Sequence, residues 1–311
     1  MKKILVTGGA GYIGSSLVTA LVNNNYEVTV IDILNYNKES LNHLYKFKNF
    51  KFYKEDANQE KNIKKLIKGK DFIIPLAALV GAPLCEKNKR LASITNVNSI
   101  KLILKHIKKK QKLIYPTTNS GYGIGDKNKL CDEKSELNPI SHYGKTKVQA
   151  EKLIMGHKNS IAFRLATVFG SSFRMRTDLL VNNFVYEAFY NKKLILFEQN
   201  FRRNYIHIND IILGFLFSIK NFNKLKSNIY NMGLSTANIT KHQLAKKIKK
   251  HLPKTKIIIK NNKKDPDKRD YFVSNKKIEK KGFKATYTLD HGIEELINIF
   301  KISKSKIKNN Y

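Results

Sequence analysis

Tyr143 and Lys147 are four positions apart in the stretch SHYGKTKVQAE, and their residue types suit proton transfer. On a helix this spacing places both side chains on one face. A tyrosine hydroxyl ordinarily has a pKa of about 10, too high for a base at neutral pH. A neighbouring ammonium group and the positively charged ring of a bound hydride acceptor would both favour the phenolate. Tyr143 is therefore expected to accept a proton from an alcohol that is losing hydride, while Lys147 also holds the bound acceptor.

A glycine-rich turn, TGGAGYIG at 7–14, stands between a predicted strand and a predicted helix. Gly8 permits the tight turn, Gly11 lets the backbone approach a pyrophosphate, and Gly14 allows close packing of helix on sheet. Tyr12 and Ile13 belong to the same turn. The pattern predicts a dinucleotide site.

Two carboxylates follow at the ends of the next two predicted strands. Asp32, beside Ile33, ends the strand 27–33, where it would accept hydrogen bonds from the adenosine ribose hydroxyls. Its charge would repel a 2′-phosphate, so NAD is favoured over NADP. A turn or helix-cap role for Asp32 is the alternative. Asp56, followed by Ala57, ends the strand 50–56 and is a candidate partner for the adenine amino group.

The elements that must position these residues alternate between strand and helix over the first half of the chain. Such alternation predicts an α/β fold with a doubly wound parallel sheet, a Rossmann fold. From about 171 the elements become mixed, which predicts an NAD-binding domain over 1–170 and a smaller mixed α/β lobe over 171–311, partly interleaved with the sheet. The polar tail after about 302 is expected to fray. We predict strands at 3–8, 27–33, 50–56, 71–78, 112–118, 160–168 and 256–260, and helices at 13–24, 95–109, 178–191, 240–251 and 290–301.

The formal charge of +35 comes almost entirely from lysine, because only seven of the 59 basic residues are arginine. A nucleic-acid-binding protein would be expected to favour arginine and to interleave aromatic residues with it, so nucleic acid is not an expected partner.

Cys85 and Cys131 are too few for a disulfide framework, and no metal site is expected. The amino terminus leaves no room for a signal peptide and no apolar run is long enough to span a membrane, which predicts a cytoplasmic protein.

Taken together, these motifs resemble the extended short-chain dehydrogenase/reductase family, in its nucleotide-sugar epimerase and dehydratase group. The resemblance covers nearly the whole chain. It rests on TGGAGYIG, Asp32, Asp56, LAA at 76–78, Asn96, Thr118 before GYG, YGKTK at 143–147 and RRNYIHIND at 202–210.

The resemblance assigns further roles near the reacting centre. Thr118 would hydrogen-bond the reacting hydroxyl as the third catalytic residue, with Ser120 as a second candidate in contact with substrate. Asn96 would position the catalytic lysine or a water. The segment Leu76, Ala77 and Ala78 would pass under the cofactor, although many relatives have histidine where Leu76 stands.

The resemblance also implies the substrate site. Arg203 and Arg269 occupy positions that clamp a substrate diphosphate, for which a guanidinium fork is suited. An ion pair with Asp210 or Asp270 is the structural alternative for these arginines. Arg174 and Arg176 are expected to line the same cleft, with Asn182 or Asn183 touching a hydroxyl or phosphate, and packing within the loop is the alternative for these residues.

The two residues directly after Thr118 narrow the choice of reaction. Related 4,6-dehydratases carry an Asp-Glu pair there, and epimerases acting at carbons 3 and 5 need a cysteine base, whereas this chain has Asn119 and Ser120. The resemblance thus implies oxidation at C4 of a UDP- or GDP-linked sugar, by a 4-epimerase or a 4-dehydrogenase, in cell-surface polysaccharide synthesis.

The segments PLAALVGAPLC and YPTTNSGYGIG further resemble the GDP-manno-heptose C4-dehydrogenases. A homodimer through helices that include 95–109 and 142–156 is the family expectation. An extended dehydrogenase acting on a non-sugar alcohol, and a non-catalytic NAD-binding protein, remain as alternatives.

Overall fold

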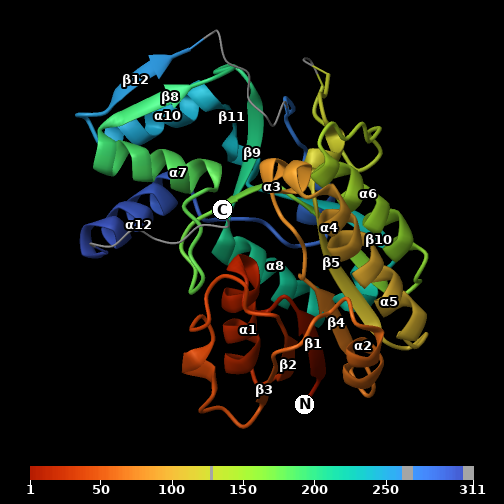
Figure 1. Ribbon diagram of the computed structural model, residues 1–311. Coiled ribbons are helices and arrows are strands. Elements are labelled where there is room, and N and C mark those ends of the chain that lie inside the picture. Colours follow the sequence, from red (N-terminus) through yellow and green to blue (C-terminus); the bar gives the residue numbers. More distant parts are fainter. Residues whose placement is uncertain (127–128, 261–268, 304–311) are drawn as a thin grey trace.

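A seven-stranded parallel sheet forms the centre of the computed structural model, which describes residues 1–126, 129–260 and 269–303 (Figure 1). The strand order is β3-β2-β1-β4-β5-β6-β10, and every pairing is parallel. This is the doubly wound order, with its reversal at β1 and β4. The predicted fold class is confirmed. The strands are β1 (Lys3–Thr7), β2 (Glu27–Ile31), β3 (Phe50–Tyr53), β4 (Phe72–Pro75), β5 (Lys112–Thr118), β6 (Ser160–Leu165) and β10 (Asn228–Met232).

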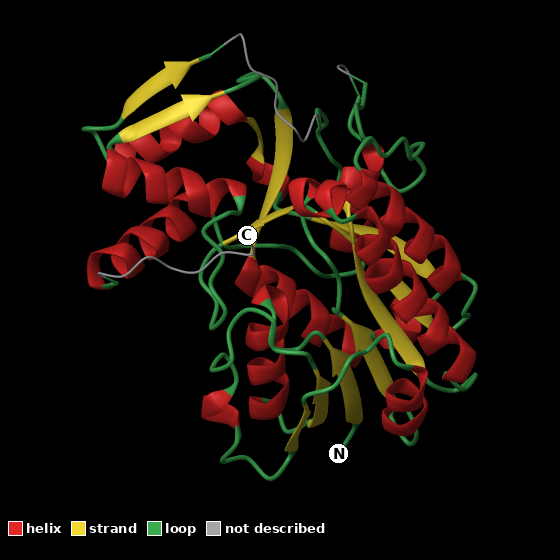
Figure 2. Cartoon of the chain, in the orientation of Figure 1, coloured by secondary structure: helices red, strands yellow, loops and turns green. Residues whose placement is uncertain are grey.

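Both faces of the sheet are covered, because successive side chains of each strand point to opposite faces. In β1, Ile4 and Val6 belong to one buried apolar cluster, and Leu5 belongs to another. Helices α1 (Tyr12–Asn23) and α8 (Ile208–Lys220) supply the first cluster. Helices α2 (Glu60–Leu66), α5 (Ser99–His106) and α6 (His142–Met155) supply the second (Figures 1 and 2).

Several observed boundaries differ from the predicted ones. The predicted strand 160–168 divides at Ala166, since β6 pairs with β10 whereas β7 (Thr167–Phe169) joins a second sheet. The predicted helix 95–109 contains a π-helical segment, Ile94–Asn98, and α5 ends where Ile107 turns to an extended conformation. Short helices precede it at α3 (Ala82–Lys87) and α4 (Lys89–Ser93).

The second part of the chain builds a smaller lobe over the carboxyl ends of the large sheet. There β9 (Arg202–His207) pairs with β7 and with β11 (Asn238–Thr240), and β8 (Lys193–Leu196) pairs with β12 (Lys256–Ile259). The remaining helices are α7 (Leu180–Tyr186), which continues as a π-helical segment (Glu187–Asn191), α9 (Phe222–Leu225), α10 (Lys241–His251), α11 (Lys276–Glu279) and α12 (Leu289–Ile302). Thus α7, α10, α12 and β12 lie close to the predicted ranges.

Strand β10 and helix α8 come from the range 171–311 yet belong to the layers of the large sheet. A cut at residue 170 would therefore separate β10 from its partner β6. The predicted domain ranges stay a prediction. The expected fraying concerns 304–311, which lie outside the described residues. Over the described ranges, the helices fall short of the length and apolarity that crossing a membrane requires.

Candidate active site

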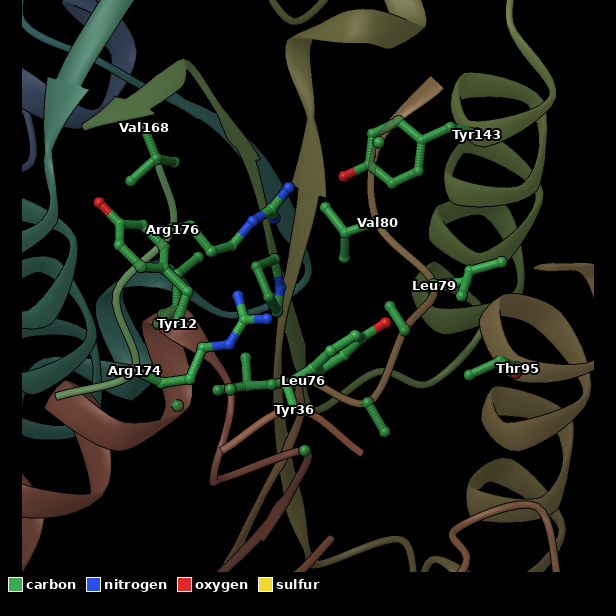
Figure 3. Close-up of a pocket in the computed structure, with 18 of the residues that line it drawn as sticks. Tyr12, Tyr36, Leu76, Leu79, Val80, Thr95, Tyr143, Val168, Arg174 and Arg176 are labelled. Carbon is green, nitrogen blue, oxygen red and sulfur yellow. The ribbon is translucent and has the colours of Figure 1, made fainter. Parts of the chain in front are cut away.

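A cavity of about 540 Å³ opens at the carboxyl ends of β1, β2, β4, β5 and β6, under the lobe (Figure 3). Open α/β sheets bind ligands at this edge, where the strand order reverses. Most of the predicted site residues line it. They are Gly8, Gly11, Tyr12, Ile13, Gly14, Asp32, Ile33, Asp56, Ala57, Leu76, Ala77, Ala78, Thr118, Tyr143, Lys147, Arg174, Asn183, Arg203 and Arg269.

The glycine turn at one end of this cavity accepts only residues without a side chain. Gly8 has a φ of +71°, and a Cβ atom there would lie 2.4 Å from the Ala77 nitrogen. A Cβ atom on Gly14 would lie 2.4 Å from the Gly8 carbonyl oxygen. The turn therefore brings bare backbone and the amino end of α1 to the cavity wall, an arrangement that fits a pyrophosphate.

Asp32 stands directly beyond the end of β2 and faces the same cavity. Its Oδ2 accepts a hydrogen bond from the Ala10 nitrogen at 3.0 Å, and its Oδ1 accepts one from the Leu34 nitrogen at 2.8 Å. Asp32 thus makes the turn contacts proposed as the alternative and also lines the cavity. Burial raises the pKa of this carboxyl, and the two backbone hydrogen bonds act in the opposite direction and lower it. Each oxygen keeps a lone pair for a ribose hydroxyl.

Asp56 occupies the equivalent place after β3. Its Oδ1 accepts hydrogen bonds from the backbone nitrogen of Asn58 at 2.8 Å and from the Asn58 side-chain amide at 3.0 Å. These contacts fix the carboxylate in the cavity wall.

Thr118 and Tyr143 come together at the opposite end of the cavity. Thr118 ends β5, and its hydroxyl is near enough to the phenol of Tyr143 to act, as a hydrogen-bonding group, on the pKa of that phenol. Helix α6 begins at His142 because Ser141 caps it, with its Oγ accepting from the Gly144 nitrogen at 3.2 Å. This start places Tyr143 in the first turn and Lys147 one turn later, both lining the cavity.

The pKa of Tyr143 differs from the expected direction. Burial raises it to about 12, although the charges of Arg269 and Arg176 and the Thr118 hydrogen bond act to lower it. The chain by itself therefore keeps the phenol protonated at neutral pH. Neighbouring cations do favour the phenolate, as expected, but in the protein alone the effect of burial is larger.

Lys147 is buried, and burial lowers the pKa of its ammonium group to about 7 against the opposing charge of Glu151. Its Nζ atom lies 4.0 Å from the centroid of the Tyr115 ring. Within the described part of the chain we find no oxygen atom in hydrogen-bond contact with Nζ. The three donors of the ammonium group are thus left for a ligand in the cavity.

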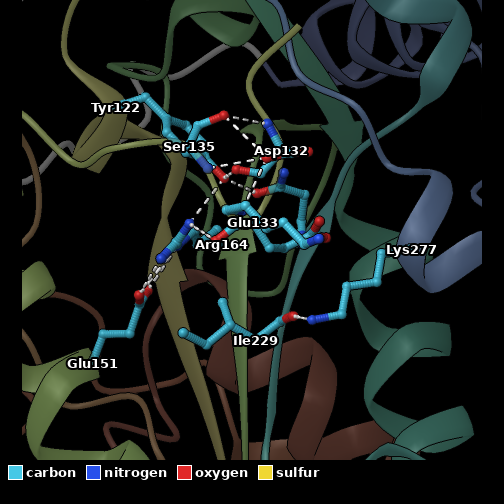
Figure 4. Close-up of polar contacts among 10 residues, drawn as sticks. Tyr122, Asp132, Glu133, Ser135, Glu151, Arg164, Ile229 and Lys277 are labelled. Carbon is cyan, nitrogen blue, oxygen red and sulfur yellow. Dashed lines mark hydrogen bonds and ion pairs between the residues drawn. The ribbon is translucent and has the colours of Figure 1, made fainter.

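A buried polar network lies behind Lys147 (Figure 4). Glu151, one turn further along α6, forms a bidentate ion pair with Arg164 of β6, with an Nη2–Oε1 distance of 2.7 Å. Arg164 also donates to the Tyr122 hydroxyl at 3.1 Å, and Tyr122 donates to Asn231 at 2.7 Å. Sequence reasoning missed this network, although Arg164 is one of the chain's few arginines and Glu151 follows Tyr143 by eight residues on one helix.

Asn96 and Asn182 do not reach the cavity, contrary to the prediction. Asn96 is bound to the backbone of Leu79 through both amide atoms and to the Thr146 hydroxyl, so it fixes the loop after β4 against α6. The Asn182 oxygen accepts from the Gly170 nitrogen at 3.0 Å, and its amide nitrogen donates to the Arg176 carbonyl at 2.8 Å. Both side chains are buried and used by the protein itself.

Ser120 is also buried outside the lining of the cavity, and this placement corrects its predicted contact with substrate. Its Oγ lies 2.9 Å from the Thr118 hydroxyl and accepts a hydrogen bond from Arg269. Ser120 therefore connects Thr118, which faces the cavity, with the guanidinium group of Arg269.

The carboxylates proposed as structural partners of Arg203 and Arg269 have other contacts. Asp270 pairs with Arg202 at 2.8 Å, and Asp210 accepts hydrogen bonds from the backbone nitrogens of Thr286 and Tyr287. Both Arg203 and Arg269 line the cavity close to Tyr205, where they act to lower its pKa.

Arg174 and Arg176 point into the cavity from the segment after β7, and they lie near different partners (Figure 3). The Arg174 guanidinium lies 4.5 Å from the centroid of the Tyr36 ring and acts electrostatically on Asp32. Arg176 forms a buried ion pair with Asp178 and acts on Tyr143. The sequence reasoning did not single out Tyr36 or Asp178. Across the described ranges, no three His, Cys, Asp or Glu side chains group closely enough to hold a metal ion.

Comparison with known proteins agrees with this site. Residues 4–233 match the model of the NAD dependent epimerase/dehydratase family, a stretch that contains the glycine turn, Asp32, Thr118, Tyr143 and Lys147. A dTDP-D-glucose 4,6-dehydratase of Dictyostelium discoideum is 29% identical over 80% of this chain, which spans 62% of that protein. A putative UDP-glucose 4-epimerase of Methanocaldococcus jannaschii is 26% identical over 96% of this chain and 98% of that protein.

Among solved structures, the UDP-glucuronic acid 4-epimerase of Bacillus cereus, crystallised with UDP-glucuronic acid and NAD, superimposes with a TM-score of 0.86. It is 24% identical, and the alignment covers 96% of this chain and 99% of that one, so it shows the fold. The chain belongs to the NAD-dependent epimerase/dehydratase family, is an enzyme, and uses NAD as its cofactor.

Proposed function

We propose that this enzyme oxidises the C4 hydroxyl of a nucleoside-diphosphate sugar, either transiently, as a 4-epimerase, or with release of the 4-keto sugar. One observation carries the proposal. Tyr143, Thr118 and Lys147 line a single cavity together with Asp32, which follows β2, and with two arginines, Arg203 and Arg269.

When bound, NAD supplies the acceptor for the hydride that leaves the sugar carbon. Tyr143 takes the proton of the same hydroxyl, so the alcohol becomes a ketone without a free alkoxide. Thr118 orients that hydroxyl through its own hydrogen bond. Lys147, whose ammonium donors have no oxygen partner among the described residues, holds the nicotinamide ribose and stabilises the phenolate of Tyr143.

The diphosphate of the substrate is assigned to Arg203 and Arg269. Both guanidinium groups line the cavity, and a planar fork binds phosphate oxygens bidentately. The nucleotide is uridine or guanosine diphosphate, and GDP-manno-heptose is included among the candidate sugars because of the loop resemblance. The names of the relatives, UDP-glucose epimerase and dTDP-glucose dehydratase, support a nucleotide-sugar substrate. Cell-surface polysaccharide synthesis is the proposed use of the product.

The residues beside Thr118 argue against dehydration. Asn119 and Ser120 are both buried, and neither can act as a carboxylate acid or base. Four carboxylates line the cavity over the described residues. Glu55 and Asp56 follow β3, Asp32 follows β2, and Asp178 is paired with Arg176. None of these four carboxylates is therefore available as the acid or the base that dehydration needs at the sugar carbons beyond C4.

A homodimer in the cytoplasm is the remaining part of the proposal. Helices α5 and α6 pack side by side on one face of the sheet, and they lie within the predicted dimer segments 95–109 and 142–156. The proposed substrate and cofactor are cytoplasmic metabolites, which supports the location. Light scattering of the purified protein tests the dimer, and a monomer at micromolar concentration would contradict it.

The test of the proposed activity begins with denaturing the purified protein and identifying the released dinucleotide and nucleotide sugar by mass spectrometry. UDP- and GDP-sugars are then offered while NADH absorbance is followed. An increase in NADH absorbance together with a 4-keto product would identify a dehydrogenase. Inversion at C4 with no net formation of NADH would identify an epimerase. Failure of every nucleotide sugar, with turnover of a simple alcohol, would overturn the proposal.

A further inference from the structure

We propose that Arg174 is a cofactor-binding residue, whose guanidinium group binds the diphosphate of NAD from the side opposite the glycine turn. This role differs from the place in the substrate cleft that the family resemblance implies for Arg174. The inference concerns the cofactor, so it stands whatever sugar the enzyme uses.

The position of the side chain is the first step. The Arg174 guanidinium carbon lies 4.5 Å from the centroid of the Tyr36 ring, which belongs to the loop after β2 and lines the dinucleotide end of the cavity. Asp32 and Tyr36 are among the groups whose charges act on the pKa of Arg174, which burial lowers. Figure 3 shows Arg174 entering the cavity beside Tyr36 and Leu76, away from Tyr143.

The backbone around Arg174 is fixed to the helix that begins at the glycine turn. The Tyr12 hydroxyl donates to the Gly170 carbonyl at 2.7 Å, and the Ser172 hydroxyl donates to the Tyr12 carbonyl at 2.6 Å. The Arg174 nitrogen donates to Ser15 Oγ at 3.2 Å. These contacts all fall on the first turn of α1. The segment 170–174 is thus held at a set distance from the backbone that faces the pyrophosphate.

A stacked pair of rings extends this attachment beyond α1. Phe173 stacks on His43 with a centroid separation of 4.3 Å, and His43 contacts the Thr19 hydroxyl at 2.8 Å. The segment therefore also contacts the loop after β2, which carries Tyr36. Arg174 is held between α1 and this loop, the two elements that flank the adenosine end of the cavity.

The negative charge of the diphosphate is the chemical reason for assigning Arg174 to it. The turn TGGAGYIG offers backbone N–H groups but has no basic side chain, whereas a diphosphate carries two negative charges. A guanidinium group is the side chain best suited to bind two phosphate oxygens at once. The 3% exposure of Arg174 means that water competes little for these donors.

Arg176 is a contrasting neighbour. It lies two residues further on, is paired with Asp178, and acts electrostatically on Tyr143. Arg176 and Asp178 also act on the pKa of Arg174, so the two arginines share one cavity. Of the two, Arg174 is the one that contacts the Tyr36 ring and acts on the pKa of Asp32.

The test measures dissociation constants by calorimetry on cofactor-stripped protein, for NAD, ADP-ribose and adenosine, and for NADP, UDP and GDP as comparison ligands. Arg174→Met is expected to weaken binding of NAD and ADP-ribose by roughly 10- to 100-fold and to leave adenosine unchanged. Arg174→Lys, which keeps the charge but not the fork, should recover part of the affinity. The matched control is Arg90→Met, on an exposed residue of α4, which should bind all of these ligands as the native chain does.

Three outcomes would overturn the inference. The first is unchanged NAD affinity with weakened binding of UDP or GDP, which would return Arg174 to the substrate. The second is a loss of adenosine affinity as large as the loss of NAD affinity in both Arg174 variants, which would indicate a collapsed site. The third is a selective loss of NADP binding, which would place the guanidinium group on a 2′-phosphate. A failure of the proposed sugar oxidation would leave these binding constants unaffected.

Discussion

The Nζ atom of Lys147 lies over the ring of Tyr115, 4.0 Å from its centroid. Tyr115 is buried in β5, three residues before Thr118. The face of an aromatic ring attracts a cation, and the attraction is stronger when both groups are removed from water. Because burial lowers the pKa of Lys147 to about 7, its charge at neutral pH depends on such contacts.

Removal of the Tyr115 ring should make Lys147 lose its proton at a lower pH. If a charged Lys147 is needed for turnover, the high-pH limb of kcat should move down by roughly 1.5 pH units in Tyr115→Leu, given a cation–π energy of about 2 kcal/mol. Tyr115→Phe keeps the ring and should retain the native profile. Profiles of kcat against pH for both variants test this, and an equal shift in the two would point to the hydroxyl instead.

Lys147 should also make folding of the cofactor-free protein depend on pH. Its pKa is lowered from the ordinary 10.5 to about 7, so the unfolded chain binds one more proton between these values. Stability relative to Lys147→Met should therefore rise from neutral pH toward alkaline pH and level off near the unfolded pKa. Urea unfolding of the two proteins at about pH 7 and about pH 9 measures the difference. A difference that stays constant or falls over this window would contradict the prediction.

Tyr143→Phe removes the hydroxyl that we propose takes the substrate proton and leaves the ring in place. Turnover should fall by a factor on the order of 10² or more, with NAD affinity nearly unchanged. Steady-state kinetics on the identified substrate, combined with calorimetric NAD binding, test both parts. Unaltered turnover would remove Tyr143 from the mechanism.

The ion pair of Glu151 and Arg164 is buried on both sides, with side chains 3% and 5% exposed. Arg164→Met leaves the Glu151 carboxylate without its bidentate partner, so the free energy of unfolding should fall by about 3 to 5 kcal/mol. The double variant Arg164→Met with Glu151→Leu removes both charges and should be more stable than the single variant. Urea denaturation compares them, and a double variant less stable than Arg164→Met would show that the pair contributes through packing.

Local patterns predicted most of the fold and the centre of the site. The glycine turn, the carboxylate after β2 and the Tyr143–Lys147 spacing each lie within a few residues of chain, where turn chemistry and helix period decide the geometry. The alternation of Ile4, Leu5 and Val6 between two apolar clusters follows from the strand period alone.

Side-chain partners from distant segments were less predictable. Asn182 has the residue type of a ligand, yet Gly170 and the Arg176 backbone take both of its amide atoms. The strand expected at 160–168 divides because Ala166 still bonds to β10 through Met232, whereas the next residues pair with β9. Neither pairing leaves a local signature in the sequence.

The sequence by itself determined the class of fold, the glycine turn and the placing of Tyr143 and Lys147 on one helix face, because each depends on periods and spacings inside one or two elements. Only the tertiary structure decided that Arg174 acts on Asp32 while Arg176 acts on Tyr143, and that the Tyr115 ring lies against Lys147. The physical reason is that burial and charge act through space, so the environment of a side chain is set by the elements packed against it.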